Sequence, residues 1–199
     1  MRRFKLIGLT GQSGAGKSTV SKLFAERGAM VINADEIVAE LYTPCSPCLK
    51  AVAAQFGADI INGDGTLNRR MLAERAFSSV ENTAALNGLV HPFVTAKLFE
   101  QLKESKDIVV FDAPQLFESG ADVICDCVIA VVADESLRTQ RIMKRDSLTE
   151  EQALSRIRAQ HSESFFRVHA DFIIENNSDE CYLLRQGEEV YNTITNGVM

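Results

Sequence analysis

The chain has 199 residues, of which 46% are hydrophobic and 24% are charged, and its formal net charge is −6. This length and composition predict one globular domain with its own core, and exclude a collagen-like or largely disordered chain. General nucleic-acid binding is also excluded, because it depends on basic side chains that neutralise phosphates, and here acidic residues outnumber basic ones.

The five cysteines are irregularly spaced and do not indicate a disulfide framework. Cys45 and Cys48 form a Cys-x-x-Cys pair, but no second pair follows that would complete a zinc site. We therefore expect reduced thiols and a cytoplasmic location. The apolar stretch after the basic start is too short for a signal peptide, and no run reaches the roughly 18 apolar residues that span a bilayer.

Strands are predicted where apolar residues form short runs. The runs at residues 108–111 and 127–132 are continuous, which is typical of strands buried on both faces. Strands that alternate with helices predict an α/β fold, in which helices cover both faces of a parallel sheet. In chain order, the predicted strands are residues 6–10, 30–32, 108–111, 127–132 and 172–174.

Helices are predicted from apolar periodicity and from capping residues. The stretch between the second and third strands, which includes residues 67–103 with an interruption near His91 and Pro92, is too long for a simple crossover. It therefore predicts an inserted helical subdomain. In chain order, we expect helices at 17–27 (ending at Gly28), at 47–56 (between Ser46 and Gly57), from Asp134 to Lys144, after the capping box of Thr149 and Gln152, and after residues 177–180.

The glycine-rich loop at residues 11–18 is the strongest motif. It reads Gly-Gln-Ser-Gly-Ala-Gly-Lys-Ser and matches G-x-x-x-x-G-K-[ST], between a predicted strand and a predicted helix. Its glycines let backbone N–H groups point at phosphate oxygens, and the helix N-terminus adds partial positive charge. Lys17 is placed to reach the β and γ phosphates, and the Ser18 hydroxyl to bind Mg²⁺. Nucleotide binding is therefore predicted.

A phosphate loop leaves three functions open: a small-molecule kinase, a GTP-dependent switch, and a nucleotide-binding module without chemistry. A GTP switch usually carries an Asn-Lys-x-Asp guanine reader and an Asp-x-x-Gly after the third strand. The chain has no such reader, and its third strand ends in Asp112-Ala-Pro. Both absences favour a kinase.

Two carboxylates follow predicted strands, where the carboxyl ends of parallel strands face a ligand crevice. Asp35 follows the second strand and is placed either to orient and deprotonate a substrate hydroxyl or to cap the helix over residues 36–41. Asp112 ends the third strand, where it can hold the water shell of Mg²⁺, touch the substrate or stabilise its loop.

Arg138, Arg141 and Arg145 share one face of a predicted helix, and Arg156 and Arg158 lie on the next one. Such a face is often only solvated. An arginine-rich helical hairpin is also what a closing lid requires, because it brings guanidinium groups to the transferring phosphoryl group and excludes water.

Taken in order, these motifs resemble the dephospho-coenzyme A kinases nearly from end to end. The resemblance implies transfer of the ATP γ-phosphoryl group to the ribose 3′-hydroxyl of dephospho-coenzyme A, the last step of coenzyme A synthesis. Kinases of nucleosides, nucleoside monophosphates or other small alcohols, and a non-catalytic nucleotide-dependent protein, are the alternatives. The residues that carry the resemblance are 9–19, 31–35, 64–70, 91–92, 112–118, 140–146, 156–160 and 170–177.

The fold that the resemblance implies is a P-loop NTPase-type parallel sheet flanked by helices, in one domain. It also implies ATP, Mg²⁺ and a small-molecule substrate, with no nucleic-acid or membrane partner. The expected parts are a core at 1–34, 105–135 and 169–199, a helical substrate-binding insertion at about 35–104, and a helical lid at about 136–168.

Site residues follow from the resemblance by position. Asp35 is the expected base, Lys17 and Arg141 complete the catalytic set, and Ser18 is the metal ligand. The expected ATP-binding residues are Gly11, Gln12, Ser13, Gly14, Ala15, Gly16, Lys17, Ser18, Thr19 and Arg145, with Asn176 and Asn177 beside the adenine. The expected substrate-binding residues are Asp35, Arg70, His91, Asp112, Leu116, Phe117 and Glu118.

Three positions depart from the pattern of the family. Asn33 stands where an aspartate is frequent, so Asp35 is the only acid of that motif. Gln115 replaces a common leucine, and Ser178 follows the asparagine pair in place of a common glycine.

Overall fold

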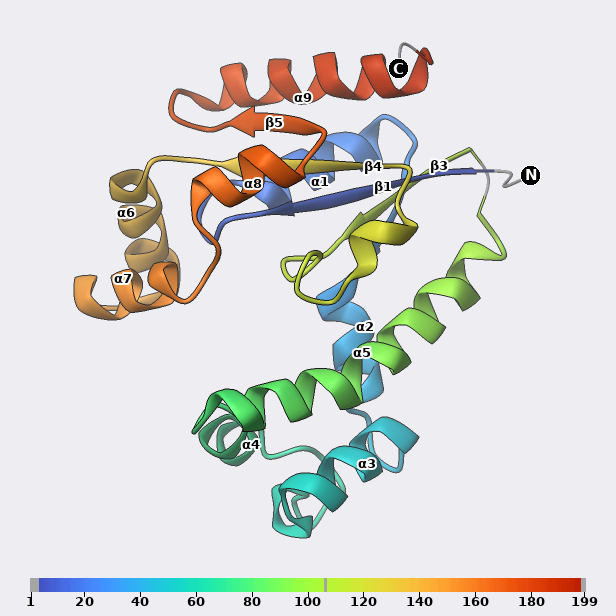
Figure 1. The fold of residues 1–199 in the computed structure, drawn as a ribbon, viewed down its shortest axis with the longest axis vertical. Helices are drawn as coiled ribbons and strands as arrows, with labels where there is room; N and C mark the ends of the chain where they lie inside the picture. Colours follow the sequence, from blue (N-terminus) through green and yellow to red (C-terminus); the bar gives the residue numbers. More distant parts are fainter. Residues whose placement is uncertain (1–3, 106, 198–199) are drawn as a thin grey trace. The chain divides into compact units, whose positions relative to one another are not determined.

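The computed structural model describes residues 4–105 and 107–197 (Figure 1). The chain divides into two compact units. The first contains Met1–Ile32 and Ser105–Met199, and the second contains Asn33–Glu104. Each unit is described separately below.

A five-stranded sheet forms the centre of the first unit, in the order β2-β3-β1-β4-β5. The strands are β1 (Phe4–Gly11), β2 (Met30–Asn33), β3 (Asp107–Asp112), β4 (Cys127–Val132) and β5 (Phe172–Glu175). β1 pairs in parallel with β3 and β4, and β4 pairs in parallel with β5. The predicted parallel sheet is confirmed, and each predicted strand lies within an observed one.

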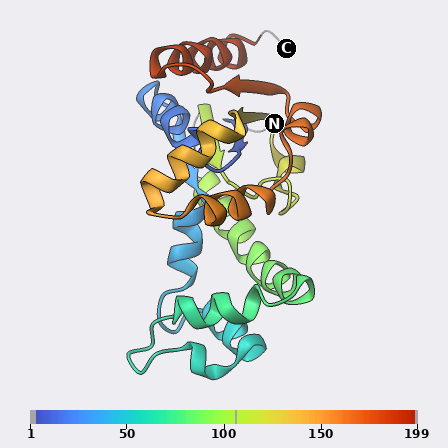
Figure 2. The same cartoon turned by 90° about the vertical axis from the view of Figure 1, so that its left-hand side faces the viewer.

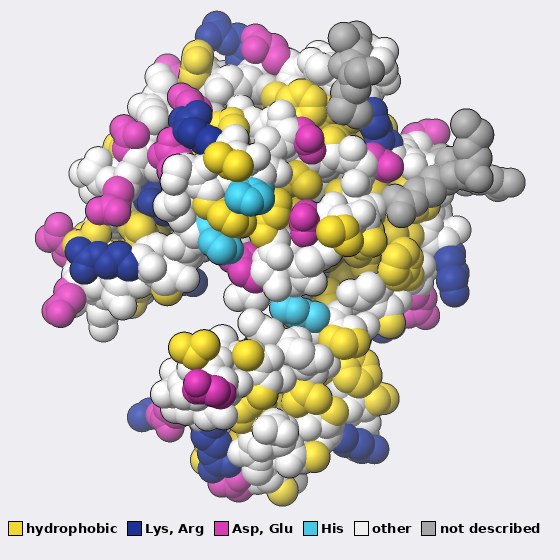
Figure 3. Space-filling model, viewed as in Figure 1, with side chains coloured by type: hydrophobic (Ala, Val, Ile, Leu, Met, Phe, Trp, Pro, Cys, Tyr) yellow, Lys and Arg dark blue, Asp and Glu magenta, His cyan; other side chains and the backbone are white. Residues whose placement is uncertain are grey.

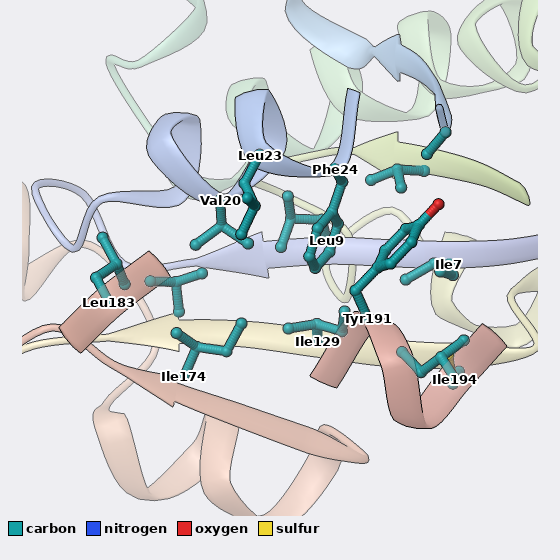
Figure 4. Close-up of a cluster of buried hydrophobic side chains, with 14 of the residues drawn as sticks. Ile7, Leu9, Val20, Leu23, Phe24, Ile129, Ile174, Leu183, Tyr191 and Ile194 are labelled. Carbon is teal, nitrogen blue, oxygen red and sulfur yellow. The ribbon is translucent and has the colours of Figure 1, made fainter. Parts of the chain in front are cut away.

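Alternate side chains of the central strands pack on opposite faces of the sheet. Ile129 and Val131 lie in a core with α1 (Lys17–Glu26) and α9 (Glu180–Thr195) (Figure 4). Ala130 and Val132 lie in a smaller cluster with Phe166 of α8 (Glu163–His169). Helices therefore cover both faces of β4, as its continuous apolar run predicts.

A pair of helices follows β4 in the first unit. α6 (Glu135–Asp146) and α7 (Glu150–Arg158) pack against each other through Ile142, Ala153 and Ile157 (Figures 1 and 2). The capping box of Thr149 and Gln152 opens α7, as predicted. The prediction that Asp134 caps α6 is wrong for its side chain, which makes no capping bond, although Asp134 occupies the N-cap position. A short 3₁₀ helix, Ala121–Ile124, precedes β4.

Four helices make up the second unit. They are α2 (Ala34–Leu41), α3 (Pro47–Phe56), α4 (Arg69–Ala76) and α5 (Val80–Leu102), with a short 3₁₀ helix at Ala58–Ile60. α3 has the predicted bounds, with Ser46 accepting a hydrogen bond from the Leu49 amide at 3.0 Å and Gly57 at the end. Nowhere in the described residues does a helix combine the length and apolarity that crossing a bilayer requires.

The interruption expected near His91 and Pro92 is absent, so that prediction is wrong. α5 continues through Pro92, and the helical stretch breaks before Val80 instead. A proline inside a helix removes one backbone hydrogen bond and costs about 3 kcal/mol. Leu86 and Val90 before the proline and Leu98 and Leu102 after it are buried, and this packing offsets that cost.

Candidate functional site

The loop between β1 and α1 has the conformation that its glycines allow. Gly14 and Gly16 have φ angles of 78° and 100°, a region that glycine adopts without strain. A Cβ atom on Gly16 would lie 2.4 Å from the Asn176 Nδ2, so the fold leaves no room for a side chain there. Within the described residues, the backbone amides of Gly14, Gly16, Lys17 and Ser18 donate to no protein acceptor. Orphan donors at a helix N-terminus fit the oxygens of a polyphosphate.

Lys17 and Asp112 form an ion pair at the carboxyl ends of β1 and β3. These ends meet because the two strands are neighbours and parallel. Asp112 is 3% exposed, so Lys17 is the group that neutralises its buried charge. The ammonium group has three donors, and the contact with Asp112 leaves others for a ligand oxygen.

Asn176 and Arg141 join three elements around the loop. Asn176 lies after β5, where its amide donates to the Val132 carbonyl at 2.9 Å. Its side-chain Nδ2 donates to the Ala15 carbonyl at 2.7 Å. The Arg141 Nη2 donates to the backbone and side-chain oxygens of Asn176 at 3.1 and 3.3 Å, and its Nη1 donates to the Gly14 carbonyl at 3.3 Å.

The neighbour of Asn176 makes a different contact. The Asn177 Oδ1 accepts a hydrogen bond of 2.7 Å from the Asp134 amide, at the start of α6. Asn176 and Asn177 thus connect the end of β5 both to the phosphate loop and to α6. In both residues expected beside the adenine, the side-chain oxygen accepts a hydrogen bond from the protein.

The arginines that share one face of α6 make contacts with the protein and are not only exposed to solvent. Arg138 is 5% exposed and its Nε donates to the Ala133 carbonyl at 3.0 Å, and burial lowers the pKa of its guanidinium. Arg145 donates two hydrogen bonds of 2.8 Å to Asp146, which raise the pKa of Arg145 and lower the pKa of Asp146. Arg156 of α7 donates to the same carboxylate at 2.6 Å, so an ion-pair network ties α6 to α7.

The segment after β3 contributes buried and aromatic side chains. Leu116 is fully buried, and Phe117 packs against Phe165 with ring centroids 5.3 Å apart. Phe165 is stacked between His161 and His169 at 3.7 and 4.0 Å. Figure 3 shows histidines among apolar side chains in the region of α8. Glu118 lies 3.6 Å from His161, so this segment contacts the chain that follows α7.

Asp35, Arg70 and His91 belong to the second unit. Asp35 lies in the first turn of α2 and is exposed, and its carboxylate makes no ion pair or hydrogen bond within residues 4–105 and 107–197. The alternative in which Asp35 caps this helix is wrong, because Asn33 occupies that position. Arg70 of α4 pairs with Glu74 at 2.9 Å and is strongly exposed, and His91 lies within α5.

Asn33 is expected to contribute to stability as the cap of α2. Its Oδ1 accepts hydrogen bonds from the Asp35 and Glu36 amides at 2.8 and 3.3 Å. Asn33→Ala is expected to lower the free energy of unfolding by about 1 kcal/mol, whereas Asn33→Asp keeps an acceptor and is expected to change it little. Urea unfolding of the three proteins measures both effects, and an alanine variant as stable as the parent would contradict this role.

Comparisons with known proteins agree on one family. The model of the dephospho-CoA kinase family matches residues 5–181. The chain belongs to the dephospho-CoA kinase family. A relative of that name from Corynebacterium diphtheriae is 38% identical over 191 residues, which cover 94% of this chain and 96% of the relative. Another, from Fusobacterium nucleatum, is 38% identical over 191 residues, covering 95% of this chain and 98% of the relative.

Solved structures show the same fold. A protein from Thermus thermophilus superposes with a TM-score of 0.84 at 31% identity and covers 96% of this chain and 98% of its own. The dephospho-CoA kinase from Campylobacter jejuni gives a TM-score of 0.71 at 28% identity, with 98% of each chain covered. A shikimate kinase from Acinetobacter baumannii, at 18% identity and a TM-score of 0.57, shares the fold alone. The predicted family and the phosphate-loop kinase fold are confirmed.

A dephospho-CoA kinase uses a nucleotide, and the loop also fits a magnesium ion bound with it. In the part of the chain that the structure describes, no group of three or more His, Cys, Asp and Glu side chains could hold a metal. Phosphate loops do not require such a group, because their Mg²⁺ is bound by the loop hydroxyl, the phosphates and water. Ser18 is the hydroxyl at that position, and it is exposed at the start of α1.

Three contacts of the site lack a local sequence signal. Lys17 with Asp112, Ala15 with Asn176, and Ser13 with Gln160 each join residues about a hundred or more positions apart in the chain. Gln160, whose Oε1 accepts from the Ser13 amide at 2.8 Å, is a residue of the site that the sequence analysis does not predict. These contacts depend on strand order, which neighbouring residues do not encode.

Proposed function

We propose that this chain transfers the γ-phosphoryl group of ATP to the ribose 3′-hydroxyl of dephospho-CoA, giving CoA and ADP. The observation that carries the proposal is a phosphate loop whose amides at positions 14 and 16–18 have no acceptor among the described residues, with a lysine at its mouth, in a chain that belongs to the dephospho-CoA kinase family. In the reaction, the 3′-oxygen forms a bond to the γ-phosphorus, and the bond from the γ-phosphorus to the β–γ bridging oxygen breaks. The proton of the hydroxyl leaves with a base.

The first unit supplies the nucleotide-binding groups in this proposal. The loop amides bind phosphate oxygens, and Lys17 neutralises charge that builds up on the transferring group. Ser18 would hold Mg²⁺, which supplies charge neutralisation at the phosphates when bound. Arg141 lies against the same loop and adds a second positive charge there. Arg145 and Asn177 are proposed to contribute to the ATP site.

The second unit is proposed to be the acceptor-binding insertion. Asp35 is the proposed base, because its carboxylate is exposed and committed to no partner within the described residues. Arg70 and His91 are proposed to bind the acceptor, together with Asp112 and residues 116–118 of the first unit. The arginine-bearing helices α6 and α7 are proposed to act as the lid, since the pairing of Arg145 and Arg156 with Asp146 lets them move as one piece.

The decisive experiment follows product mass as well as ADP. Incubation with Mg-ATP and dephospho-CoA is expected to give CoA and ADP in equal amounts, detected by liquid chromatography and mass spectrometry. Dephospho-CoA lacking the 3′-hydroxyl is the matched control and is expected to give neither product. A panel of nucleosides, nucleoside monophosphates and shikimate tests the alternative acceptors. Turnover of one of these without turnover of dephospho-CoA would overturn the proposal. The experiment does not address the cytoplasmic location, which stays a prediction.

A further inference from the structure

The side chain of Asn176 is buried and engaged at both of its polar atoms. Asn176 is 8% exposed, its Nδ2 donates to the Ala15 carbonyl at 2.7 Å, and its Oδ1 accepts from Arg141 at 3.3 Å. The backbone of the same residue is held at the end of the β4–β5 pairing through the Val132 carbonyl. The amide side chain is therefore fixed by the sheet on one side and faces the phosphate loop on the other.

The contact with Ala15 determines where a neighbouring N–H group points. The Ala15 carbonyl and the Gly16 amide belong to one planar trans peptide, so the two groups point in opposite directions. By holding the carbonyl, Asn176 fixes the direction of the Gly16 N–H. That N–H has no protein acceptor within the described residues, and it is one of the donors that a phosphate loop offers to its ligand.

The restraint from Asn176 matters because the residue at position 16 is glycine. Gly16 has a φ of 100°, and no side chain at that position restrains its backbone. A peptide between Ala15 and a residue this free would lose conformational entropy when a phosphate binds. A hydrogen bond from a buried, fixed amide reduces that loss, because the peptide is already oriented.

Arg141 makes the same kind of contact one residue earlier. Its Nη1 donates to the Gly14 carbonyl at 3.3 Å while its Nη2 is held by Asn176. Asn176 therefore reaches the loop twice, directly through Ala15 and indirectly through Arg141. Both polar atoms of the Asn176 amide are therefore engaged, Nδ2 by the Ala15 carbonyl and Oδ1 by Arg141.

We propose that Asn176 is a positioning residue of the phosphate loop, which orients the Gly16 N–H and the Arg141 guanidinium toward the phosphates and does not read the adenine. The proposal rests on the proposed function only for the identity of the nucleotide. It predicts that polyphosphate binding depends on Asn176 whether or not a base is attached.

Two substitutions remove the amide N–H of Asn176 in different ways. Asn176→Asp keeps the size and an acceptor for Arg141, but it places a carboxylate oxygen against the Ala15 carbonyl. Asn176→Ser removes the amide N–H without adding charge, and leaves only a hydroxyl on a side chain that is one bond shorter. Leaving a hydrogen-bonding group unsatisfied changes affinity by on the order of tenfold. In both variants we expect the dissociation constants of Mg-ATP and of magnesium tripolyphosphate, measured by calorimetry, to rise by the same factor of about ten or more.

The matched control is Asn192→Asp, the same exchange on the exposed side of α9, which is expected to change neither dissociation constant. Thermal unfolding by circular dichroism identifies a temperature at which every variant is folded. If the aspartate variant does not fold, the serine variant alone is used for the binding measurements. A loss of ATP affinity with unchanged tripolyphosphate affinity would mean that Asn176 reads the base. Lower thermal stability with both affinities intact would mean a purely structural residue. Either result overturns the proposal.

The outcome is independent of the acceptor. If dephospho-CoA is not phosphorylated by the parent protein but both Asn176 variants lose ATP and tripolyphosphate affinity equally, the proposed function fails and the positioning role stands. If dephospho-CoA is phosphorylated and the ATP and tripolyphosphate affinities do not fall together, the proposed function stands and the positioning role of Asn176 fails.

Discussion

Lys17→Met is expected to lower the turnover number at least a hundredfold and to weaken Mg-ATP binding. The lysine is the group at the mouth of the loop that can meet charge on the transferring phosphoryl group, and removing one such contact typically costs 10²–10³ in rate, on the order of 3–4 kcal/mol. Methionine keeps much of the length of the side chain and removes the charge. Single-turnover kinetics and calorimetry with a nonhydrolysable ATP analogue separate the loss in rate from the loss in affinity.

The ion pair with Asp112 adds a second, separable effect. Lys17→Met leaves the Asp112 carboxylate, which is 3% exposed, without its partner, so the variant is also expected to be less stable. Lys17→Met combined with Asp112→Asn removes that uncompensated charge. The double variant is therefore expected to regain thermal stability without regaining turnover.

Lys22→Met is the matched control for Lys17→Met, because it makes the same exchange on the exposed side of the same helix. The Lys22 side chain is 79% exposed and pairs with the exposed Glu26 at 3.8 Å, so little change in rate or stability is expected. An unchanged ATP affinity in Lys17→Met would contradict the assignment of the loop as the phosphate cradle.

The strands of the first unit could be predicted from the sequence because their signals are local. Residues 127–132 form an uninterrupted apolar run, and the structure buries every one of them in β4. The capping box at Thr149 and the Ser46–Pro47 start of α3 are also local patterns, and each fixes a helix end in the structure.

Two local rules led to wrong predictions for physical reasons. Pro92 ends a helix in isolation, but the apolar residues buried on both sides of it hold α5 together. The alternative in which Asp35 caps α2 is wrong because Asn33, three residues before Glu36, has the spacing of an N-cap followed by an acid. The continuation of α5 through Pro92 depends on tertiary contacts that the sequence does not show, whereas the cap of α2 has a signal in the sequence.

The contacts within the nucleotide site could be predicted only by resemblance. The resemblance places Asn176 beside the adenine, and nothing in its neighbouring residues indicates that its amide meets the Ala15 carbonyl. That contact exists because β1 and β5 flank the same strand, β4, in the sheet. Strand order therefore determines which side chains meet at the loop.

Asp35→Asn is expected to lower the turnover number by on the order of 10² or more, the usual contribution of a positioned base. The effect is smaller if the transition state is strongly dissociative, because the hydroxyl then needs less deprotonation. Asp35 is exposed and its carboxylate makes no ion pair within the described residues, so stability is expected to stay within about 0.5 kcal/mol of the parent. Mg-ATP affinity is expected to be nearly unchanged.

The kinetic constants distinguish a base from a residue that only binds the acceptor. A base acts in the transition state, so its loss lowers kcat and leaves the KM for dephospho-CoA nearly constant, whereas the loss of a ground-state contact raises KM at constant kcat. Glu36→Gln is the matched control, since Glu36 is the adjacent exposed acid in the same turn of α2 and its carboxylate is given no role in the reaction. Full kcat in Asp35→Asn would remove Asp35 from the chemistry and leave the hydroxyl proton to water or to the phosphoryl oxygens themselves.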